Sequence, residues 1–230
     1  MKTIGIIGGM GALATADLFY KIINETKASK DGENIPLIID NNTQIPDRTE
    51  FILGNGENPL PELIKSAKRL KNSGCELIVL ACNTAHFFAD EIIKQVDIQI
   101  LHIAKNTINV VNHKFKNVKK VAVIATTATK KTGIYDKELI KFGFESVYID
   151  DIMQNDIMSC IYDGAKAGKI TEYLPKFESI LNRIKADIYI AACTEIPLFL
   201  PYLENKFNFI DPTLELAKEI IKYSRDIKII

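Results

Sequence analysis

Two cysteines of this 230-residue chain each follow a short apolar run and precede a hydroxyl or amide residue. Cys82 is followed by Asn83 and Thr84, and Cys193 is followed by Thr194. Asn83 or Thr84 can cap a helix after the first cysteine, and Thr194 can cap one after the second. Helix N-terminal amides favour the thiolate, so both positions predict thiols of lowered pKa. A thiolate and a thiol that face each other could take a proton from one side of a carbon atom and supply one to the other side.

The elements that carry these cysteines alternate between apolar strands and amphipathic helices, which is typical of parallel α/β sheets. In the first half we expect strands at residues 3–9, 36–40, 77–82 and 98–101, a polar loop at 41–49, and helices at 15–27, 61–73 and 85–95. In the second half we expect strands at 121–127, 146–149, 187–193 and 209–210, and helices at 135–142, 155–162, 171–185 and 212–224. The fold class is therefore α/β.

The two halves share the same order of elements, which suggests an internal duplication. From Ile7 to Cys82 is 75 residues, and from Ile124 to Cys193 is 69. We expect two similar Rossmann-like lobes with parallel sheets, related by a pseudo-two-fold axis, and an active site in the cleft between them. Residues 1–104 plus 208–230 would form the N-terminal α/β lobe, and residues 105–207 the C-terminal α/β lobe.

Composition excludes several classes of protein. Lys+Arg and Asp+Glu both total 29, so the formal charge is zero, whereas a partner such as nucleic acid or an anionic membrane normally requires a basic excess. Four glycines interrupt the apolar N-terminus, which resembles a signal peptide only loosely. No apolar run approaches the roughly 18 residues of a membrane helix. We expect a cytoplasmic protein with free thiols and no nucleic-acid or membrane partner.

A dinucleotide site is an alternative. Gly9, Gly11 and Ala14 fit the pattern G-x-G-x-x-[G/A] between a strand and a helix, and Asp40 could bind a ribose. Asp40 lies 29 residues after Gly11, however, where about 20 are expected. The glycines are better explained by backbone amides that approach a carboxylate closely, although a dinucleotide-binding oxidoreductase stays open.

Metal and hydrolase chemistry are two further alternatives. Cys82 and His86 have the spacing of half a zinc site, but Cys193 has no nearby histidine, so we expect no metal. A cysteine hydrolase would need a histidine base with an orienting group, and His102 and His113 lie in settings that suggest neither. A non-catalytic amino-acid-binding protein also remains compatible with the pattern.

Five segments together resemble the aspartate/glutamate racemase family, most closely its cofactor-independent aspartate racemases. They are GGMGxxAT at 8–15, IPDRT at 45–49, CNTAH at 82–86, KAG at 166–168 and CTEIP at 193–197. Ala12 departs from the family pattern, in which relatives usually carry proline, and we expect this to alter loop stiffness without changing the chemistry. Both cysteines of the two-base family members are retained.

The resemblance implies a homodimer that interconverts L- and D-aspartate with no cofactor, in particular without pyridoxal phosphate. Cys82 and Cys193 would be catalytic, and Arg48 and Lys166 would bind substrate carboxylates. The full set of substrate-binding residues implied is Met10, Gln44, Arg48, Asn83, Thr84, Thr127, Lys166, Thr194 and Glu195. Amides that follow each cysteine could stabilise the carbanion, as an oxyanion hole does. Glutamate or a broader set of amino acids remains open as substrate.

Overall fold

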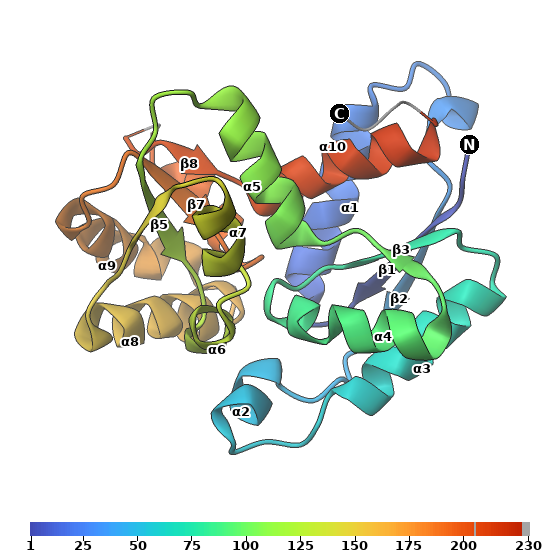
Figure 1. Ribbon diagram of the computed structural model, residues 1–230, viewed down its shortest axis with the longest axis horizontal. Helices are drawn as coiled ribbons and strands as arrows, with labels where there is room; N and C mark the ends of the chain where they lie inside the picture. The colour runs from blue at the N-terminus through green and yellow to red at the C-terminus, as the bar shows by residue number, and fades with distance from the viewer. Residues whose placement is uncertain (205, 227–230) are drawn as a thin grey trace.

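The computed structural model describes residues 1–204 and 206–226, which form two lobes side by side (Figure 1). Each lobe contains a four-stranded, fully parallel sheet. The first sheet has the order β2-β1-β3-β4, with strands β1 (Ile4–Gly8), β2 (Leu37–Asn41), β3 (Leu77–Leu80) and β4 (Gln99–Ile100). The second has the equivalent order β6-β5-β7-β8, with strands β5 (Lys120–Ile124), β6 (Glu145–Val147), β7 (Ile188–Ala191) and β8 (Phe209–Ile210). The predicted two-lobed α/β fold is confirmed.

Helices cover both faces of each sheet, which is why the central strands β1, β3 and β7 are buried along their whole length. The first lobe contains η1 (Asp31–Glu33), α1 (Ala12–Thr26), α2 (Arg48–Leu53), α3 (Leu60–Asn72), η2 (Thr84–Phe88) and α4 (Ala89–Val96). The second contains α6 (Thr127–Thr132), α7 (Asp136–Lys141), α8 (Asp151–Ser159), η3 (Cys160–Ala165), α9 (Ile170–Arg183) and η4 (Ile196–Tyr202). Two helices join the lobes, α5 (Ile103–Lys114) and α10 (Pro212–Ser224).

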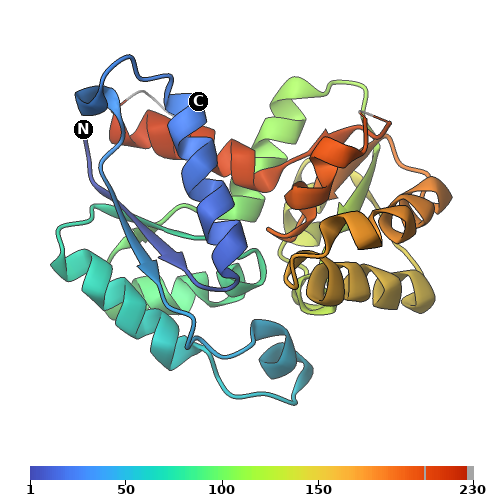
Figure 2. The same cartoon turned by 180° about the vertical axis from the view of Figure 1, so that it is seen from behind.

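The four layers of the core follow from this arrangement. In the first lobe, α1 and α10 pack on one face of the sheet, and α3 and α4 pack on the other (Figure 2). In the second lobe, α5 and α7 cover one face, and α8 and α9 cover the other. The register places Ile4 beside both Leu37 and Leu77, and Val121 beside Ser146 and Ile188. Equivalent strands therefore end at equivalent places in the two lobes.

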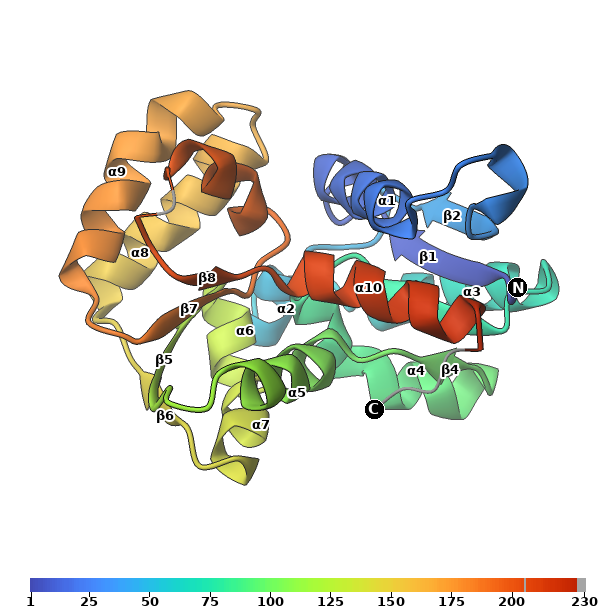
Figure 3. The same ribbon diagram turned by 90° about the horizontal axis from the view of Figure 1, so that it is seen from above.

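The chain crosses between the lobes twice, and α5 and α10 lie side by side at the crossing (Figure 3). Ile103 packs in the first lobe, whereas Ala104 already packs in the core of the second. On the return, Phe209 and Ile210 pair with β7. The expected boundary at residue 208 is therefore too early, because β8 completes the second sheet before α10 returns to the first lobe.

Three α-helices of the described residues lie outside the predicted elements, namely α2, α5 and α6. Asp47 caps α2, accepting hydrogen bonds from the backbone amides of Thr49 at 2.7 Å and Glu50 at 3.1 Å. This Asp-x-x-Glu sequence is a capping signature that the polar composition of residues 41–49 obscured. None of the helices within 1–204 and 206–226 combines the length and apolar character that a membrane crossing requires.

Candidate active site

The two cysteines follow equivalent strands, Cys82 after β3 and Cys193 after β7. Both thiols are free, and the residues Cys82 and Cys193 are buried, at 7% and 6% exposed. The neighbouring residues meet across the lobe boundary, where the Thr194 hydroxyl lies 3.5 Å from the carbonyl oxygen of Ala81. The structure thus brings the two cysteine segments together, although they are more than a hundred residues apart in the chain.

The turn after Cys82 differs from the capped α-helix that we expected. It is a 3₁₀ turn, η2, and α4 begins only at Ala89. The Asn83 side chain caps nothing, because its Oδ1 atom accepts a hydrogen bond from the Tyr135 hydroxyl at 2.5 Å. The Thr84 hydroxyl lies 2.8 Å from that of Thr129 and 3.1 Å from that of Thr126. These side chains therefore attach the first cysteine segment to the second lobe.

The turn after Cys193 is also 3₁₀, and its polar side chains bond to one another. Pro197 lies near the start of η4, as expected, but Thr194 does not cap it. Glu195 Oε2 accepts a hydrogen bond from the Cys193 thiol at 3.0 Å and lies 3.1 Å from the Thr194 hydroxyl. Burial and then the charge of Glu195 raise the pKa of Cys193 well above its usual value. Our expectation that helix amides lower the pKa of both thiols is therefore wrong for Cys193.

Cys82 has a cation as its neighbour instead. Burial would lower the pKa of the Arg48 guanidinium, but Cys82 and Asp47 raise it, and the pKa ends above its usual value. Arg48 Nη1 donates to the carbonyl oxygens of Ile45 and Pro46 at 3.2 and 2.8 Å, and Nη2 donates to that of Met10 at 3.0 Å. Its Nε atom is buried without a protein partner in the described ranges. Backbone carbonyls thus fix the guanidinium beside Cys82.

A cavity of about 280 Å³ lies between the lobes at this place, close to the lower end of the range for small-molecule sites. The first lobe contributes the loops at residues 9–14 and 43–48, and the second contributes Ala165, Lys166 and Glu195. The residues beside the two cysteines, Arg48 and Glu195, are therefore both in its wall. The arrangement suits a small, charged ligand.

A polar contact closes the edge of the cavity between the lobes. The Tyr162 hydroxyl donates to Asp47 Oδ2 at 3.0 Å, and Lys166 Nζ lies 4.0 Å from the same oxygen. Lys166 also lies 4.0 Å from the centre of the Tyr162 ring. Burial would raise the pKa of Asp47, but the Glu50 amide and the charges of Arg48 and Lys166 hold it below its usual value. Sequence reasoning missed Tyr162, which no motif marks.

The remaining predicted residues divide into two groups. Met10 lines the cavity together with Arg48, Lys166 and Glu195. Gln44 and Thr127 do not, although Thr43, the neighbour of Gln44, does. The Thr127 amide donates to Met158 Sδ at 3.3 Å. Asn83, Thr84 and Thr194 lie beside the cysteines, as described above. Neither they nor Cys82 and Cys193 line the cavity.

The glycine turn has a structural explanation that does not require a dinucleotide. Gly9 has a φ of +85°, and a Cβ atom there would lie 2.4 Å from the backbone of Asn42. Gly9 therefore lets two loops of the cavity wall approach closely. Asp40, which could have bound a ribose, forms an ion pair with Arg69 at 2.6 Å.

His86 forms a hydrogen bond with the backbone of Cys82. Its Nδ1 atom lies 2.9 Å from the carbonyl oxygen of Cys82, so Nδ1–H is the donor, and its ring packs on His102 at 4.9 Å. Burial, followed by the neighbouring His102, lowers the pKa of His86 to about 3. A neutral His86 therefore fixes the carbonyl group of Cys82, and the zinc alternative has no support in this contact.

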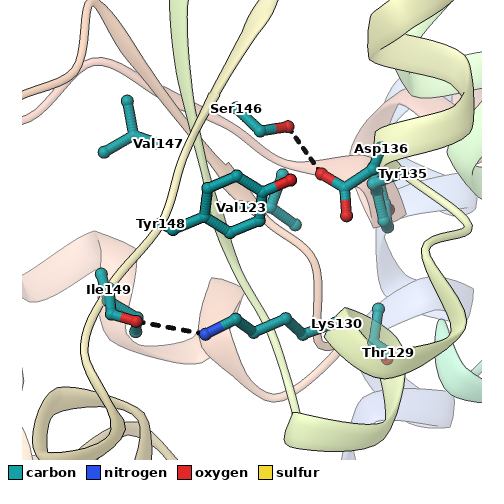
Figure 4. A pocket seen from close by; sticks show the side chains of 9 residues that line it. All are labelled: Val123, Thr129, Lys130, Tyr135, Asp136, Ser146, Val147, Tyr148 and Ile149. Atoms are coloured by element: carbon teal, nitrogen blue, oxygen red, sulfur yellow. Dashed lines mark hydrogen bonds between the residues drawn. The ribbon is translucent and has the colours of Figure 1, made fainter.

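A second cavity, beside β5 and β6, is too small for a substrate. Its volume is about 20 Å³, roughly that needed for one water molecule. Lys130 Nζ donates to the carbonyl oxygen of Ile149 at 3.1 Å across it, and Ser146 donates to Asp136 at 2.6 Å (Figure 4). Unlike the interlobe cavity, its wall contains neither Arg48 nor Glu195.

The fold and site together define a two-lobed α/β protein with two cysteines after equivalent strands, whose charged neighbours Arg48 and Glu195 line an interlobe cavity. The family model of Asp/Glu/hydantoin racemases matches residues 7–220. The chain belongs to this family, and the resemblance noted in the sequence is confirmed. Members are isomerases of small amino-acid substrates, so the coarse enzyme class follows from membership.

Particular relatives show the range within the family. The chain is 27% identical over 225 residues to the broad specificity amino-acid racemase RacX of Bacillus subtilis, with 95% of this chain and 96% of that protein covered. Its structure is similar to the aspartate racemase of Picrophilus torridus, with a TM-score of 0.89, 30% identity and coverage of 98% and 95%. An aspartate racemase homologue from Pyrococcus horikoshii gives a TM-score of 0.76 at 25% identity, with coverage of 98% and 100%.

Proposed function

We propose that this protein interconverts L- and D-aspartate without a cofactor, and that Cys82 and Cys193 form its acid–base pair. The observation that carries the proposal is the opposite charge beside the two cysteines. Arg48 lies next to Cys82, and the Glu195 carboxylate accepts a hydrogen bond from Cys193. A cation stabilises a thiolate, whereas a carboxylate keeps its neighbour protonated. The free enzyme would then hold one thiolate and one thiol, as inversion of a carbon atom requires.

In one direction, the Cys82 thiolate removes the α-hydrogen of the bound amino acid as a proton. The Cys193 thiol delivers its own proton to the opposite face of the same carbon. The products are the other enantiomer, a Cys82 thiol and a Cys193 thiolate, and the reverse direction uses the same steps backwards. A pair of thiolates would lack an acid and a pair of thiols would lack a base, so each turnover requires one thiolate and one thiol.

Substrate binding is assigned to the polar groups around the cavity. Lys166, in the wall of the second lobe, binds the distal carboxylate of aspartate, together with the Arg48 N–H groups that are not bonded to backbone carbonyls. Asn83 Nδ2 is buried without a protein partner in the described ranges, and we assign it to the α-carboxylate although Asn83 lies outside the cavity wall. Amides after both cysteines stabilise the extra charge of the carbanion.

The test is exchange of the α-hydrogen of L- and D-aspartate in deuterated water, followed by NMR, with no cofactor added. Wild type should exchange and racemise both enantiomers. Cys82→Ala and Cys193→Ala should each abolish racemisation and keep the circular dichroism spectrum. Cys75→Ala, a matched control at a buried thiol in the first lobe, should retain activity. Racemisation at the wild-type rate by either active-site variant would reject the two-base mechanism.

A broader substrate range is the second candidate, because the broad specificity racemase of Bacillus subtilis covers nearly the whole chain. Comparing kcat/KM for aspartate, glutamate and alanine separates the two. Preference for aspartate supports the acidic site that Lys166 would form, and equal rates support broad specificity. A homodimer and a cytoplasmic location belong to the same proposal, and light scattering of the purified protein would test the first.

A further inference from the structure

The two carboxylate oxygens of Glu195 have different surroundings. Oε2 accepts a hydrogen bond from the Cys193 thiol at 3.0 Å and lies 3.1 Å from the Thr194 hydroxyl. Oε1 is buried and has no hydrogen-bond partner within residues 1–204 and 206–226. The side chain is 3% exposed. A buried carboxylate oxygen without a donor costs free energy, so a ligand that brings a donor would stabilise this site.

The space beside Oε1 belongs to the interlobe cavity. Glu195 and Gly11 both line that cavity, and a Cβ atom on Gly11 would lie 3.3 Å from Oε1. The glycine therefore keeps a small volume open next to this oxygen. Gly11 itself has ordinary extended backbone, with φ −107°, so the missing side chain matters for space and not for conformation.

The cavity wall offers few other places for a cationic group. Arg48 and Lys166 are positive and would repel one. The other carboxylate in the wall is Asp47, whose oxygens already accept from the Tyr162 hydroxyl and from two backbone amides. An α-amino acid carries one positively charged donor, its α-ammonium group. Glu195 Oε1 is the acceptor in the wall that fits it.

We propose that Glu195 binds the substrate α-ammonium group through Oε1 while Oε2 holds the Cys193 thiol. This proposal rests on the proposed racemase function and assigns Glu195 two roles. First, Glu195 selects α-amino acids over dicarboxylic acids that lack the amine. Second, it keeps Cys193 the protonated member of the cysteine pair. Arrival of the ammonium group offsets the charge of Glu195. The barrier to ionising Cys193 is then lowered only when substrate is bound.

Glu195→Gln keeps the shape of the side chain and removes its charge, so it tests the first role. Calorimetry should give a Kd for L-aspartate about 10- to 100-fold weaker than in wild type, because one charge-assisted hydrogen bond is lost. The Kd for succinate, which has the same two carboxylates and no amine, should change less than about 3-fold by the same reasoning. Equal weakening of both ligands would overturn the ammonium assignment.

The second role is tested by the pH dependence of iodoacetamide labelling at Cys193, read by mass spectrometry. In wild type, labelling should begin only above the pH at which ordinary thiols react, and in Glu195→Gln it should begin at lower pH. The pH dependence of labelling at Cys82 should be the same in Glu195→Gln as in wild type. Glu138→Gln, which removes another buried carboxylate away from the cysteines, should leave both profiles unchanged. An unmoved Cys193 profile in Glu195→Gln would overturn this role.

Gly11→Ala separates the two roles. Its methyl group would occupy the space beside Oε1 and leave the Cys193–Glu195 hydrogen bond intact, so aspartate binding should weaken with no shift in labelling. Wild-type aspartate affinity in this variant would overturn the position assigned to the ammonium group. Aspartate binding and cysteine labelling can both be measured without turnover. A failure of the roles assigned to Glu195 can therefore be distinguished from a failure of the proposed racemase function, which α-hydrogen exchange tests.

Discussion

The two half-sites are alike in backbone and opposite in charge. Cys82 and Cys193 follow equivalent strands of two parallel sheets with the same order. Cys82 has the buried Arg48 guanidinium as its neighbour, and Cys193 has the buried Glu195 carboxylate. A duplicated fold thus places two identical side chains after equivalent strands, and their charged neighbours still differ in sign.

The difference extends to the turns that support the half-sites. The turn after β1 depends on Gly9, whereas the turn after β5 depends on Thr126, whose hydroxyl caps α6 by accepting from the Thr129 amide at 3.1 Å. The first half-site also contains a buried neutral histidine, His86, that has no equivalent beside Cys193. Each difference gives a way to separate the lobes experimentally.

Gly9→Ala should have the largest effect, because a Cβ atom would meet the Asn42 backbone at 2.4 Å and would also require φ of +85°. We expect a loss of about 3–5 kcal/mol in the free energy of unfolding. Thr126→Ala, at the equivalent turn, should lose about 1 kcal/mol, the usual value of an N-cap. Urea unfolding followed by circular dichroism measures both, and similar losses would show that the turns are interchangeable.

Arg48→Met should come next, with kcat/KM for aspartate falling about 100-fold, equivalent to ~2.7 kcal/mol. The cation beside Cys82 is lost, so labelling of Cys82 at neutral pH should slow, while Cys193 should keep its labelling profile. Arg48→Lys retains the charge and should lose only about 10-fold. Arg69→Met, at a half-exposed arginine paired with Asp40, is the control. Slower labelling of both cysteines in Arg48→Met would contradict the charge asymmetry.

His86 should make the protein acid-sensitive. Its pKa is lowered to about 3 in the folded state, against about 6.5 when unfolded. The contribution of His86 to the free energy of unfolding is therefore fully present above about pH 6.5. It is lost as the pH falls toward 3, because in that range only the unfolded chain takes up the proton. Between pH 7.5 and 5 the loss from this group is about 2 kcal/mol.

His86→Gln should reduce the acid sensitivity by that amount when urea unfolding is compared at the two pH values. The exposed His113→Gln is the matched control and should show the wild-type difference. If the free energy of unfolding of His86→Gln differs between the two pH values as much as that of wild type, then His86 is not the source of the acid sensitivity.

Tyr162→Phe should have the smallest effect of the four. It removes the hydrogen bond from the Tyr162 hydroxyl to Asp47, which joins the lobes at the edge of the cavity. We expect a loss of about 1 kcal/mol, or roughly 3 °C in Tm for a chain of this size. Tyr148→Phe, at a largely exposed ring, should leave Tm unchanged. Equal Tm values for wild type and Tyr162→Phe would mean that this hydrogen bond does not stabilise the contact between the lobes.

Much of the fold could be predicted because it depends on local patterns. Buried parallel strands are continuous apolar runs, so β1, β3, β5 and β7 were clear in the sequence. The helix α10 was predicted with its observed bounds, since Pro212 marks its start. The helix α5 was missed, although Ile103, Thr107, Ile108 and Val111 have helical spacing, which could have revealed it.

The electrostatics of the site could not be predicted in the same way. The cation beside Cys82 comes from Arg48, 34 positions away, and the Asp47–Tyr162 bond spans 115 positions. Contacts at such separations leave no periodic pattern in the sequence. The Cys193–Glu195 contact is local, but a helix N-terminus and a neighbouring carboxylate act on a thiol in opposite directions. Only the structure shows that burial and then the carboxylate raise the pKa of Cys193.

The return of α10 to the first lobe has a consequence for biosynthesis. Leu216, Ala217 and Ile220 fill the same core layer as Ile4 and Ile6 of β1. On the ribosome, this face of the first sheet is therefore covered by α1 alone until α10 has been translated. The second lobe, whose sheet is complete at β8, has all of its own strands earlier. The lobe that is synthesised first is thus completed by α10, the last helix of the described residues.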